Sequence, residues 1–240
     1  MLFVSDLHLA PERSALAAAF EAFCAGPARN ARALYVLGDL FDAWIGDDQL
    51  REPFSARVGT ALAGVAAAGV PVFVLAGNRD FMLGDEFASA IGARLLPAEI
   101  VVDVHGTPTL LLHGDELCTD DVDYQRYRRW TRDPRHRRWL RALPYRLRMA
   151  MAGWLRRKSR QATAAKPESI MDVSAAAVER AFLHHGVARM IHGHTHRPAR
   201  HHLTVAGRPC ERLVLADWYD HGSVLEVTPA GIAARTLPPA

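Results

Sequence analysis

Five short apolar runs, each followed directly by polar residues, constrain the fold of this chain more than any other feature. They read LFV before SDLH, LYVL before GDLFD, VFVL before AGNRD, LLL before HGDE and RMI before HGHTH. Apolar runs of this length without alternation predict strands that are buried on both faces, as in a parallel sheet. Helical patterns over residues 12–24, 53–68 and 172–185 lie among the runs, so the sequence predicts an α/β fold.

The polar residues after the five runs are expected at one edge of the molecule. In open α/β sheets, ligands bind in the crevice beyond the carboxyl ends of the strands, which is where all five polar clusters fall. The stretch VVDVHGTPTLLL predicts a hairpin that turns at residues 106–108, and ERLVLADW, GSVLEVT and GIAARTL predict further strands. These additional strands favour two packed mixed sheets.

Length and composition exclude several classes of protein. With 240 residues, half of them apolar, the chain can bury a substantial core, so disorder is not a candidate. Three cysteines without a C-x-x-C pair argue against a disulfide framework or a thiolate zinc site and favour a reducing cytosol. The beginning, MLFVSDLHLA, lacks a basic leader, and no apolar run approaches the ~20 residues that span a bilayer. We therefore expect a protein that is neither secreted nor transmembrane.

Charge is distributed unevenly along the chain, although the net charge is only +3. Residues 126–166 hold 13 arginines and 2 lysines against a single acidic residue, Asp133, whereas the rest holds 14 basic and 25 acidic residues. Because the excess of positive charge is confined to one segment, we expect a basic functional unit inserted into an acidic body.

Seven side chains with metal-binding groups follow the five predicted strands. Taken alone, each such residue is most often a cap, a turn former or a hydrogen-bonded core residue. Their joint occurrence at one place in the fold favours a metal site, and seven oxygen and nitrogen ligands suit two ions that share a carboxylate. Such ligands favour Mn²⁺, Fe²⁺ or Zn²⁺ over Ca²⁺. The seven candidates are Asp6, His8, Asp39, Asn78, His113, His192 and His194.

The motifs that hold these residues resemble those of the calcineurin-like metallophosphoesterase superfamily. In order, DLH (6–8), GDLFD (38–42), GNRD (77–80), HGD (113–115) and HGHTH (192–196) match D-x-H, G-D-x-x-D, G-N-[HR]-[DE], H-G and G-H-x-H. The resemblance implies an α/β fold, a layered α-β-β-α sandwich with an inserted helical cap. It also implies two metal sites that share Asp39, one with Asp6, His8 and His194 and the other with Asn78, His113 and His192.

Four polar residues near these motifs leave two interpretations open. Asp42, Asp80 and Asp115 are candidates for orienting the metal ligands, but local turn capping explains them equally well. His196 is a candidate for substrate contact or for supporting a ligand, and an ordinary surface histidine is the alternative.

Arg79 stands where many phosphatases of this superfamily carry histidine. A histidine at this position can protonate an alkoxide leaving group, whereas an arginine stays charged and cannot. We expect Arg79 to bind and neutralise phosphate oxygens in the transition state. A phosphate leaving group, with a second pKa of roughly 6, needs no acid, so Arg79 favours hydrolysis of a diphosphate.

The basic segment contains an amphipathic pattern, YRLRMAMAGWLRRKSRQATAAK. It places apolar residues on one helical face and arginines elsewhere, which suits a membrane surface, an acyl-chain groove or an ordinary cap helix packed on the body. The three tryptophans of the segment also suit base stacking with nucleic acid. The apolar face comprises Leu147, Ala150, Met151, Trp154 and Leu155, and the arginines are Arg146, Arg148, Arg156 and Arg157.

The segments LGDLFDAWIGDD, GNRDFMLG, HGDELCTDD and IHGHTHRP are similar, nearly word for word, to the UDP-2,3-diacylglucosamine diphosphatases of lipid A biosynthesis. The similarity covers essentially the full chain. It implies hydrolysis of UDP-2,3-diacylglucosamine to UMP and 2,3-diacylglucosamine 1-phosphate by attack of water on the α-phosphate, with two Mn²⁺ per chain. It also implies peripheral binding to the cytoplasmic side of the inner membrane. We expect a monomer without a nucleic-acid partner.

The same resemblance implies a catalytic domain of residues 1–121 and 167–240 and a basic helical cap of residues 122–166. Asp39 and Arg79 are then expected to be catalytic. Ser159, Thr163 and Lys166 are spaced i, i+4, i+7, so one helical face would present all three to substrate. The alternative, motivated by the arginines, is a metallophosphoesterase for another nucleotide or a nucleic acid. The full set of implied substrate contacts is Asn78, Arg79, Asp121, Ser159, Thr163, Lys166 and His192.

Overall fold

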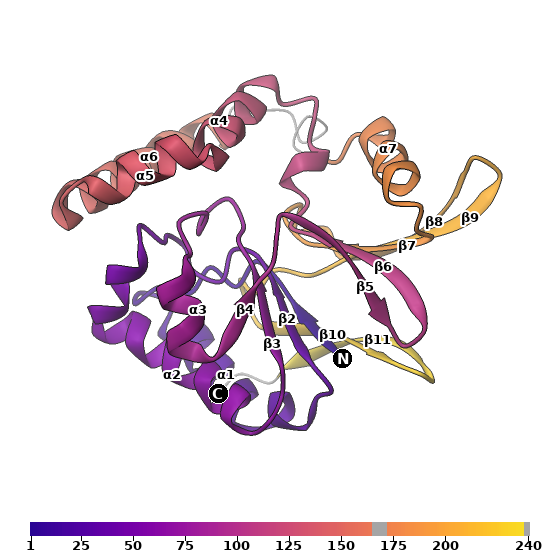
Figure 1. Ribbon diagram of the computed structural model, residues 1–240, viewed down its shortest axis with the longest axis horizontal. Helices are drawn as coiled ribbons and strands as arrows, with labels where there is room; N and C mark the ends of the chain where they lie inside the picture. Colours follow the sequence, from indigo (N-terminus) through magenta and orange to yellow (C-terminus); the bar gives the residue numbers. More distant parts are fainter. Residues whose placement is uncertain (165–171, 238–240) are drawn as a thin grey trace.

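The computed structural model describes residues 1–164 and 172–237, with side chains for residues 1–157 and 172–237. Two sheets face each other, and helices cover their outer sides (Figure 1). The first sheet has the strand order β11-β10-β1-β2-β3-β4, and the second has the order β5-β6-β7-β9-β8. This arrangement confirms the predicted α/β fold with its layered α-β-β-α sandwich.

The strands of the first sheet are β1 (Leu2–Val4), β2 (Leu34–Leu37), β3 (Val72–Leu75), β4 (Ala93–Leu95), β10 (Gly222–Thr228) and β11 (Gly231–Leu237). Those of the second are β5 (Glu99–Val104), β6 (Thr107–Leu112), β7 (Arg189–His192), β8 (Ala199–Val205) and β9 (Arg208–Val214). The helices on the body are α1 (Ser14–Ala25), α2 (Pro53–Ala67), α3 (Asp85–Ile91) and α7 (Ala175–His185).

All five apolar runs of the sequence form strands, but they are divided between the two sheets. The runs before SDLH, GDLFD and AGNRD form β1, β2 and β3, which are parallel and in register from Leu2 through Leu34 to Val72. The runs before HGDE and HGHTH form β6 and β7, which are also parallel. The polar clusters therefore meet at the edge where the two sheets come together, rather than along one sheet.

Three hydrophobic layers hold the sandwich together. Between the sheets, the ring of Tyr35 stacks on Phe3 and Phe73, with centroid separations of 4.9 Å and 4.8 Å. Leu111 and Ile191 from the second sheet pack into the same layer. A second layer lies under α1, α2 and α3, and a third lies between the second sheet and α7. These layers bury the apolar faces of both sheets and fix the edge that carries the polar clusters.

Most predicted elements are confirmed, with local differences. The helices expected over residues 12–24, 53–68 and 172–185 correspond to α1, α2 and α7. The predicted hairpin is β5–β6, but it turns one residue earlier, at His105 and Gly106, which leaves Pro108 inside β6 opposite Asp103. The sequence patterns do not indicate strand β8 or the short helix α3, which the structure adds.

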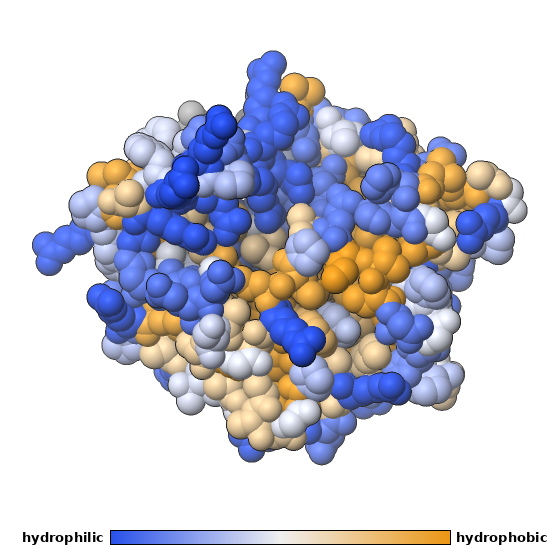
Figure 2. Space-filling model, viewed as in Figure 1, coloured by the Kyte–Doolittle hydropathy of each residue, from blue (hydrophilic) through white to orange (hydrophobic). Residues whose placement is uncertain are grey.

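The predicted basic cap is helical in its described part. It consists of α4 (Val122–Arg132), α5 (Pro134–Ala142) and α6 (Tyr145–Ala164), which extend along one side of the body in Figure 1. Asp121 caps α4 by accepting from the backbone N–H of Tyr124, and Asp133 caps α5 by accepting from that of Arg135. Figure 2 shows strongly hydrophilic side chains gathered over the region where Figure 1 draws these helices.

No helix within the described part of the chain is both long enough and apolar enough to cross a lipid bilayer.

Candidate metal centre

The loops after β1 and β2, together with the loop after β7, adopt unusual backbone conformations. Asp6, His8, Asp39, His194 and His196 all have positive φ, between 46° and 70°. This left-handed region is uncommon for residues other than glycine, and such strain concentrates at functional sites. The loops after β1 and β2 are also bonded to each other, because the backbone N–H of His8 donates to the carbonyl of Asp39.

The first group of convergent side chains consists of Asp6, His8 and His196. His196 Nε2 lies 3.3 Å from Asp6 Oδ1 and 3.4 Å from His8 Nε2. On the other side of the His196 ring, Nδ1 lies 3.5 Å from Asp217 Oδ2. A carboxylate that orients one ring nitrogen while the other faces the ligands is the usual arrangement of a metal-binding histidine. Tertiary structure therefore places His196 among the ligand candidates.

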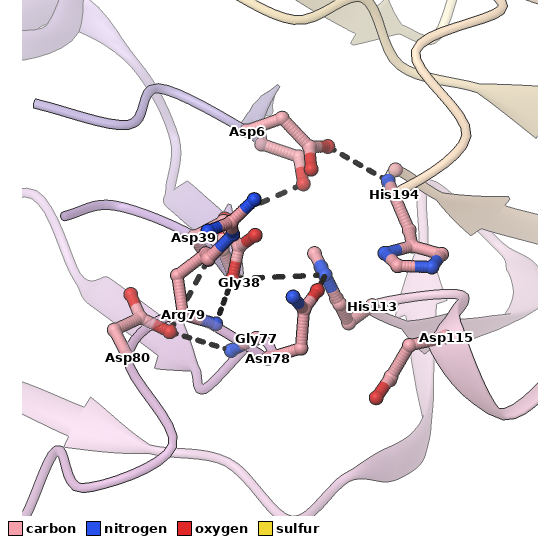
Figure 3. A network of polar contacts seen from close by, with 12 residues as sticks. Asp6, Gly38, Asp39, Gly77, Asn78, Arg79, Asp80, His113, Asp115 and His194 are labelled. Atoms are coloured by element: carbon pink, nitrogen blue, oxygen red, sulfur yellow. Dashed lines mark hydrogen bonds and ion pairs between the residues drawn. The ribbon is translucent and has the colours of Figure 1, made fainter. Parts of the chain in front are cut away.

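The second group consists of Asp6, Asp39 and His113 (Figure 3). Asp39 lies between the two groups, with Oδ1 3.8 Å from His113 Nε2 and Oδ2 3.8 Å from His8 Nδ1. His113 Nδ1 donates to the carbonyl of Leu37 at 2.9 Å, which presents Nε2 to the site, 3.0 Å from Asn78 Oδ1. The two carboxylate oxygens of Asp39 thus face different histidines.

Glycine at position 77 allows this close packing. A Cβ atom at Gly77 would lie 2.1 Å from Asp39 Oδ1, so any other residue would displace that carboxylate. Asp80 holds the same loop from below, because its buried carboxylate accepts from the backbone N–H groups of Gly77, Leu40 and Asp39 at 2.7 Å, 2.8 Å and 3.2 Å. For Asp80, the contacts with the backbone of Asp39 and Leu40 favour orientation of the candidate ligand Asp39 over local turn capping.

His194 and His192 occupy different environments. The backbone N–H of His194 donates to Asp6 Oδ2 at 2.8 Å, and its ring centroid lies 5.0 Å from that of His113. Neither His194 nor His192 belongs to the two groups of converging ligand atoms. In His192, the last residue of β7, both ring nitrogens are engaged elsewhere: its Nδ1 lies 2.8 Å from the carbonyl of Gly193, and Arg212 Nη1 donates to its Nε2 at 3.0 Å. The structure therefore gives no support to the expected ligand role of His192.

The position of Gly193 explains this difference. His192 ends a strand, so its side chain stays beside Arg212 of the neighbouring strand β9, whereas the chain turns after it and directs the following histidines to the site. The G-H-x-H motif, counted from Gly193, contains His194 and His196. This motif is the sequence signal by which His196 could have been chosen as a ligand candidate in place of His192.

Arg79 lies beside Asp39, and its backbone N–H donates to Asp39 Oδ1 at 2.8 Å (Figure 3). Asp42 and Asp115 pair with arginines of the cap: Asp42 with Arg156, and the buried Asp115 with Arg128, whose Nε donates to Oδ2 at 2.9 Å. These two carboxylates therefore connect the catalytic loops to the cap helices.

The expected substrate contacts in the cap lie mostly outside the described side chains. Ser159 and Thr163 fall within α6, where only the backbone is described, and Lys166 lies outside the described residues. Asp121 is described, and its carboxylate caps α4 by accepting from the backbone N–H of Tyr124.

The carboxylates around Asp39 and His113 favour the binding of a cation. Burial raises the pKa of Asp39 to about 7 despite the opposing effect of His113. For His113 burial acts to lower the pKa, but the carboxylates of Asp39, Asp6 and Asp115 together raise it to about 9. Carboxylates packed this closely, without solvent, need a compensating positive charge, which a divalent metal supplies.

The donor set also fits a metal. The buried Nδ1 of His8 has no hydrogen-bond partner among the described residues. Burial is the main cause that lowers the pKa of His8 to about 3, so the ring is neutral and able to act as a ligand. The converging donors are carboxylate oxygens, an amide oxygen and imidazole nitrogens, a set without sulfur that suits Mn²⁺, Fe²⁺ or Zn²⁺.

Comparison with known proteins agrees with this geometry. Residues 1–198 match the calcineurin-like phosphoesterase family. The chain is 46% identical over 243 residues to the UDP-2,3-diacylglucosamine hydrolase of Stenotrophomonas maltophilia, covering 98% of each chain. It is 47% identical to the proteins of the same name from Edwardsiella ictaluri, covering 99% of this chain and 92% of the relative, and Xanthomonas oryzae pv. oryzae, covering 97% and 96%. The chain therefore belongs to the divalent-metal-binding calcineurin-like phosphoesterases, within the family of the UDP-2,3-diacylglucosamine hydrolases.

Proposed function

We propose that this protein hydrolyses the diphosphate bond of UDP-2,3-diacylglucosamine in lipid A biosynthesis, giving UMP and 2,3-diacylglucosamine 1-phosphate. The observation that carries the proposal is the convergence of the ligand groups around Asp39, in a chain whose relatives share its full length and bear the name of this hydrolase. The nucleophile is water, which attacks the α-phosphate.

The proposed cofactor is a pair of Mn²⁺ ions. Asp6, His8, Asp39 and His196 would hold one, and Asp39, Asn78, His113 and His194 the other; this assignment replaces His192 by His196. Bound there, the metal pair would supply Lewis-acid polarisation of a phosphoryl oxygen and a lowered pKa of water. The support for the assignment is the distance set around Asp39 and the engagement of both ring nitrogens of His192 elsewhere.

Arg79 is proposed to neutralise the negative charge that grows on the phosphate oxygens as the bond breaks. Its position supports this role, since its backbone bonds to Asp39 and its guanidinium charge contributes, after burial, to the lowered pKa of His8. Because both products carry phosphate, the leaving group needs no protonation by the enzyme.

The cap is proposed to receive the acyl chains at the cytoplasmic side of the inner membrane. In α6, Arg148 is buried and bonds to Asp48 and the carbonyl of Ile45, while Leu147 and Trp154 are about half exposed. An ordinary cap helix would bury its apolar face against the body instead. Trp139 and Met149 add to the exposed apolar surface, which suits a lipid rather than the protein core.

The arginines of the cap support a lipid substrate more than a nucleic acid. Among the described side chains, five of them bond to groups of the catalytic body, so part of the basic segment is already engaged within the molecule. The five are Arg128 with Asp115, Arg132 with Ala76 and Gly77, Arg137 with Leu83, Arg148 with Asp48 and Arg156 with Asp42.

The decisive experiment is a phosphorus NMR assay of Mn²⁺-loaded protein with UDP-2,3-diacylglucosamine in ¹⁸O-labelled water, with a chelator-treated sample as control. We expect the label in UMP. Label in the lipid phosphate would retain the substrate and overturn attack at the α-phosphate. Turnover of DNA, RNA or another nucleotide in place of the lipid substrate would instead support a nucleotide-directed phosphoesterase.

A further inference from the structure

One face of helix α4 points at two of the loops that build the metal centre. Tyr124, Arg128 and Arg132 are spaced four residues apart, so they lie in one row along the helix. Each of the three forms a polar contact with a loop that follows β3 or β6. Other arginines of the cap contact the same region: Arg137 of α5 donates to the carbonyl of Leu83, later in the loop after β3, and Arg156 of α6 pairs with Asp42 in the loop after β2. The row on α4 differs because it contacts the start of the loop after β3 and the loop after β6 together.

The first two residues of the row hold the loop after His113. Tyr124 Oη donates to Asp115 Oδ2 at 2.8 Å, and Arg128 Nε donates to the same oxygen at 2.9 Å. Gln125 adds a bond from Nε2 to the backbone carbonyl of Asp115 at 2.8 Å. Since Asp115 is fully buried, this carboxylate gains its charge compensation from the helix.

Arg132, the last residue of the row, holds the other loop. Its Nη2 donates to the carbonyls of Ala76 and Gly77, both at 3.1 Å, and lies 3.7 Å from Asp115 Oδ2. Gly77 is the residue that packs against the Asp39 carboxylate, and Asn78 follows it directly. One guanidinium group thus contacts both of the loops that bring Asn78 Oδ1 and His113 Nε2 within 3.0 Å of each other.

We propose that Arg132 is a positioning residue of the metal centre, which holds the loop of Asn78 against the loop of His113 and thereby sets the affinity of the metal site they share. The inference rests on the proposed function, in which Asn78 and His113 bind the same ion. Under this proposal α4 supports the metal centre, and α5 and α6 cover the lipid.

The competing explanation is that Arg132 only anchors the cap to the body. A loosened cap would weaken the binding of a lipid substrate and leave the metal site unchanged. A displaced Asn78 loop would weaken metal binding whether or not a lipid is present, and would slow the hydrolysis of a small phosphodiester that never reaches the cap. The two explanations therefore differ in readouts other than turnover of the natural substrate.

The test compares the full-length variants Arg132→Met, Arg132→Lys and Arg126→Met with the unmodified protein. Arg126 is a matched control, because it lies on the opposite side of α4 and its contact is an exposed pair with Asp123. Mn²⁺ binding is titrated by the electron paramagnetic resonance signal of the free ion, and the hydrolysis of bis-p-nitrophenyl phosphate is measured at saturating Mn²⁺. Thermal unfolding of the metal-free proteins reports any general loss of stability.

We expect Arg132→Met to weaken the binding of one of the two ions by about 10-fold or more, which is the usual effect of removing a group that orients a ligand. Arg132→Lys restores part of the affinity, since an ammonium group can still donate to a carbonyl, and Arg126→Met binds like the unmodified protein. Unchanged metal affinity in Arg132→Met, together with an increased KM for the lipid substrate alone, overturns the inference. Failure of the unmodified protein to bind two ions overturns the proposed function itself.

Discussion

At the scale of single residues, the centre depends on side chains that are fixed by polar contacts with neighbouring groups. His113 is fixed by the carbonyl of Leu37, His196 faces Asp217, and Asp39 receives the backbone N–H of Arg79. Such support would restrict the rotation of the proposed ligands before a metal binds. The backbone strain at Asp6 and Asp39 is consistent with a site whose geometry is imposed by its surroundings.

Exchanging histidine for glutamine at position 196 and, separately, at position 192 tests which of the two histidines binds metal. His196→Gln should lower metal affinity by about 10-fold or more, because Asp6 and His8 lose a convergent donor. His192→Gln should keep its metal content, because its ring bonds Gly193 and Arg212 rather than a ligand group. Metal analysis of the purified proteins checks both, with thermal unfolding as the control for stability. The reverse outcome would restore His192 to the centre.

Replacing Arg79 by methionine should lower kcat by about 10²–10³-fold, the usual loss when one group that stabilises transition-state charge is removed. The metal content should stay the same, because the bond from residue 79 to Asp39 comes from the backbone and survives the exchange. Arg79→Lys keeps the charge without the paired donors and should be intermediate. Steady-state kinetics at saturating Mn²⁺ and metal analysis together decide, and loss of metal in Arg79→Met would contradict the assignment.

At the scale of elements, short segments here are stabilised by residues that are distant in the sequence. Helix α3 begins after Gly84, and its N-terminus is capped by Asp47, whose carboxylate accepts from the N–H groups of Gly84, Glu86 and Phe87. Trp44 Nε1 donates to the same carboxylate at 3.0 Å. One side chain therefore joins the loop after β2 to the start of α3, which explains why a helix of seven residues is stable.

Asp47→Ala tests this cap. It leaves several N–H groups without an acceptor and should lower the free energy of unfolding by about 1–3 kcal/mol, without changing the metal ligands. Glu86→Ala, an exposed acidic residue in the first turn of the same helix, is the control and should have little effect. Urea unfolding followed by circular dichroism measures both variants. Equal stabilities of the two would show that the Asp47 bonds contribute nothing.

At the scale of the whole molecule, the basic cap faces an acidic body, and part of its charge joins the two. Arg148 and Arg156 of α6 turn inward to Asp48 and Asp42, and this rotation leaves Leu147 and Trp154 on the outer side of the helix. The two kinds of side chain thus lie on different sides of α6: Arg148 and Arg156 attach the cap to the body, and the exposed apolar side chains form the surface that is proposed to contact lipid.

A double exchange, Trp139→Ala with Leu147→Ala, should lower partitioning onto phosphatidylglycerol vesicles by about 10-fold, because each removed side chain withdraws apolar area from the lipid. Leu183→Ala on α7 is the matched control, since Leu183 is 55% exposed but lies on the body. Sedimentation with vesicles at low and high salt gives the measurement. If the double variant and the control bind equally, the membrane does not contact this face of the cap.

The sequence by itself determined the layers of the fold and most of the side chains that converge around Asp6 and Asp39. Short uninterrupted apolar runs favour strands buried on both sides, and polar residues one to three positions after such a strand then emerge at its carboxyl end, as Asp6, Asp39, Asn78 and His113 do. The role expected of Arg79 also follows from the sequence, because it depends on the chemistry of its own side chain rather than on its neighbours.

Only the tertiary structure decided which histidines face the site and what the arginines contact. His192, His194 and His196 alternate in the sequence, but the turn at Gly193 separates the first from the other two, and Asp217 and Arg212, distant along the chain, distinguish their environments. Likewise, the helical pattern of the cap shows an apolar face and basic residues without showing which side turns inward. That choice depends on acceptors such as Asp48 and the carbonyls of Ala76 and Gly77, which reach the cap only through folding.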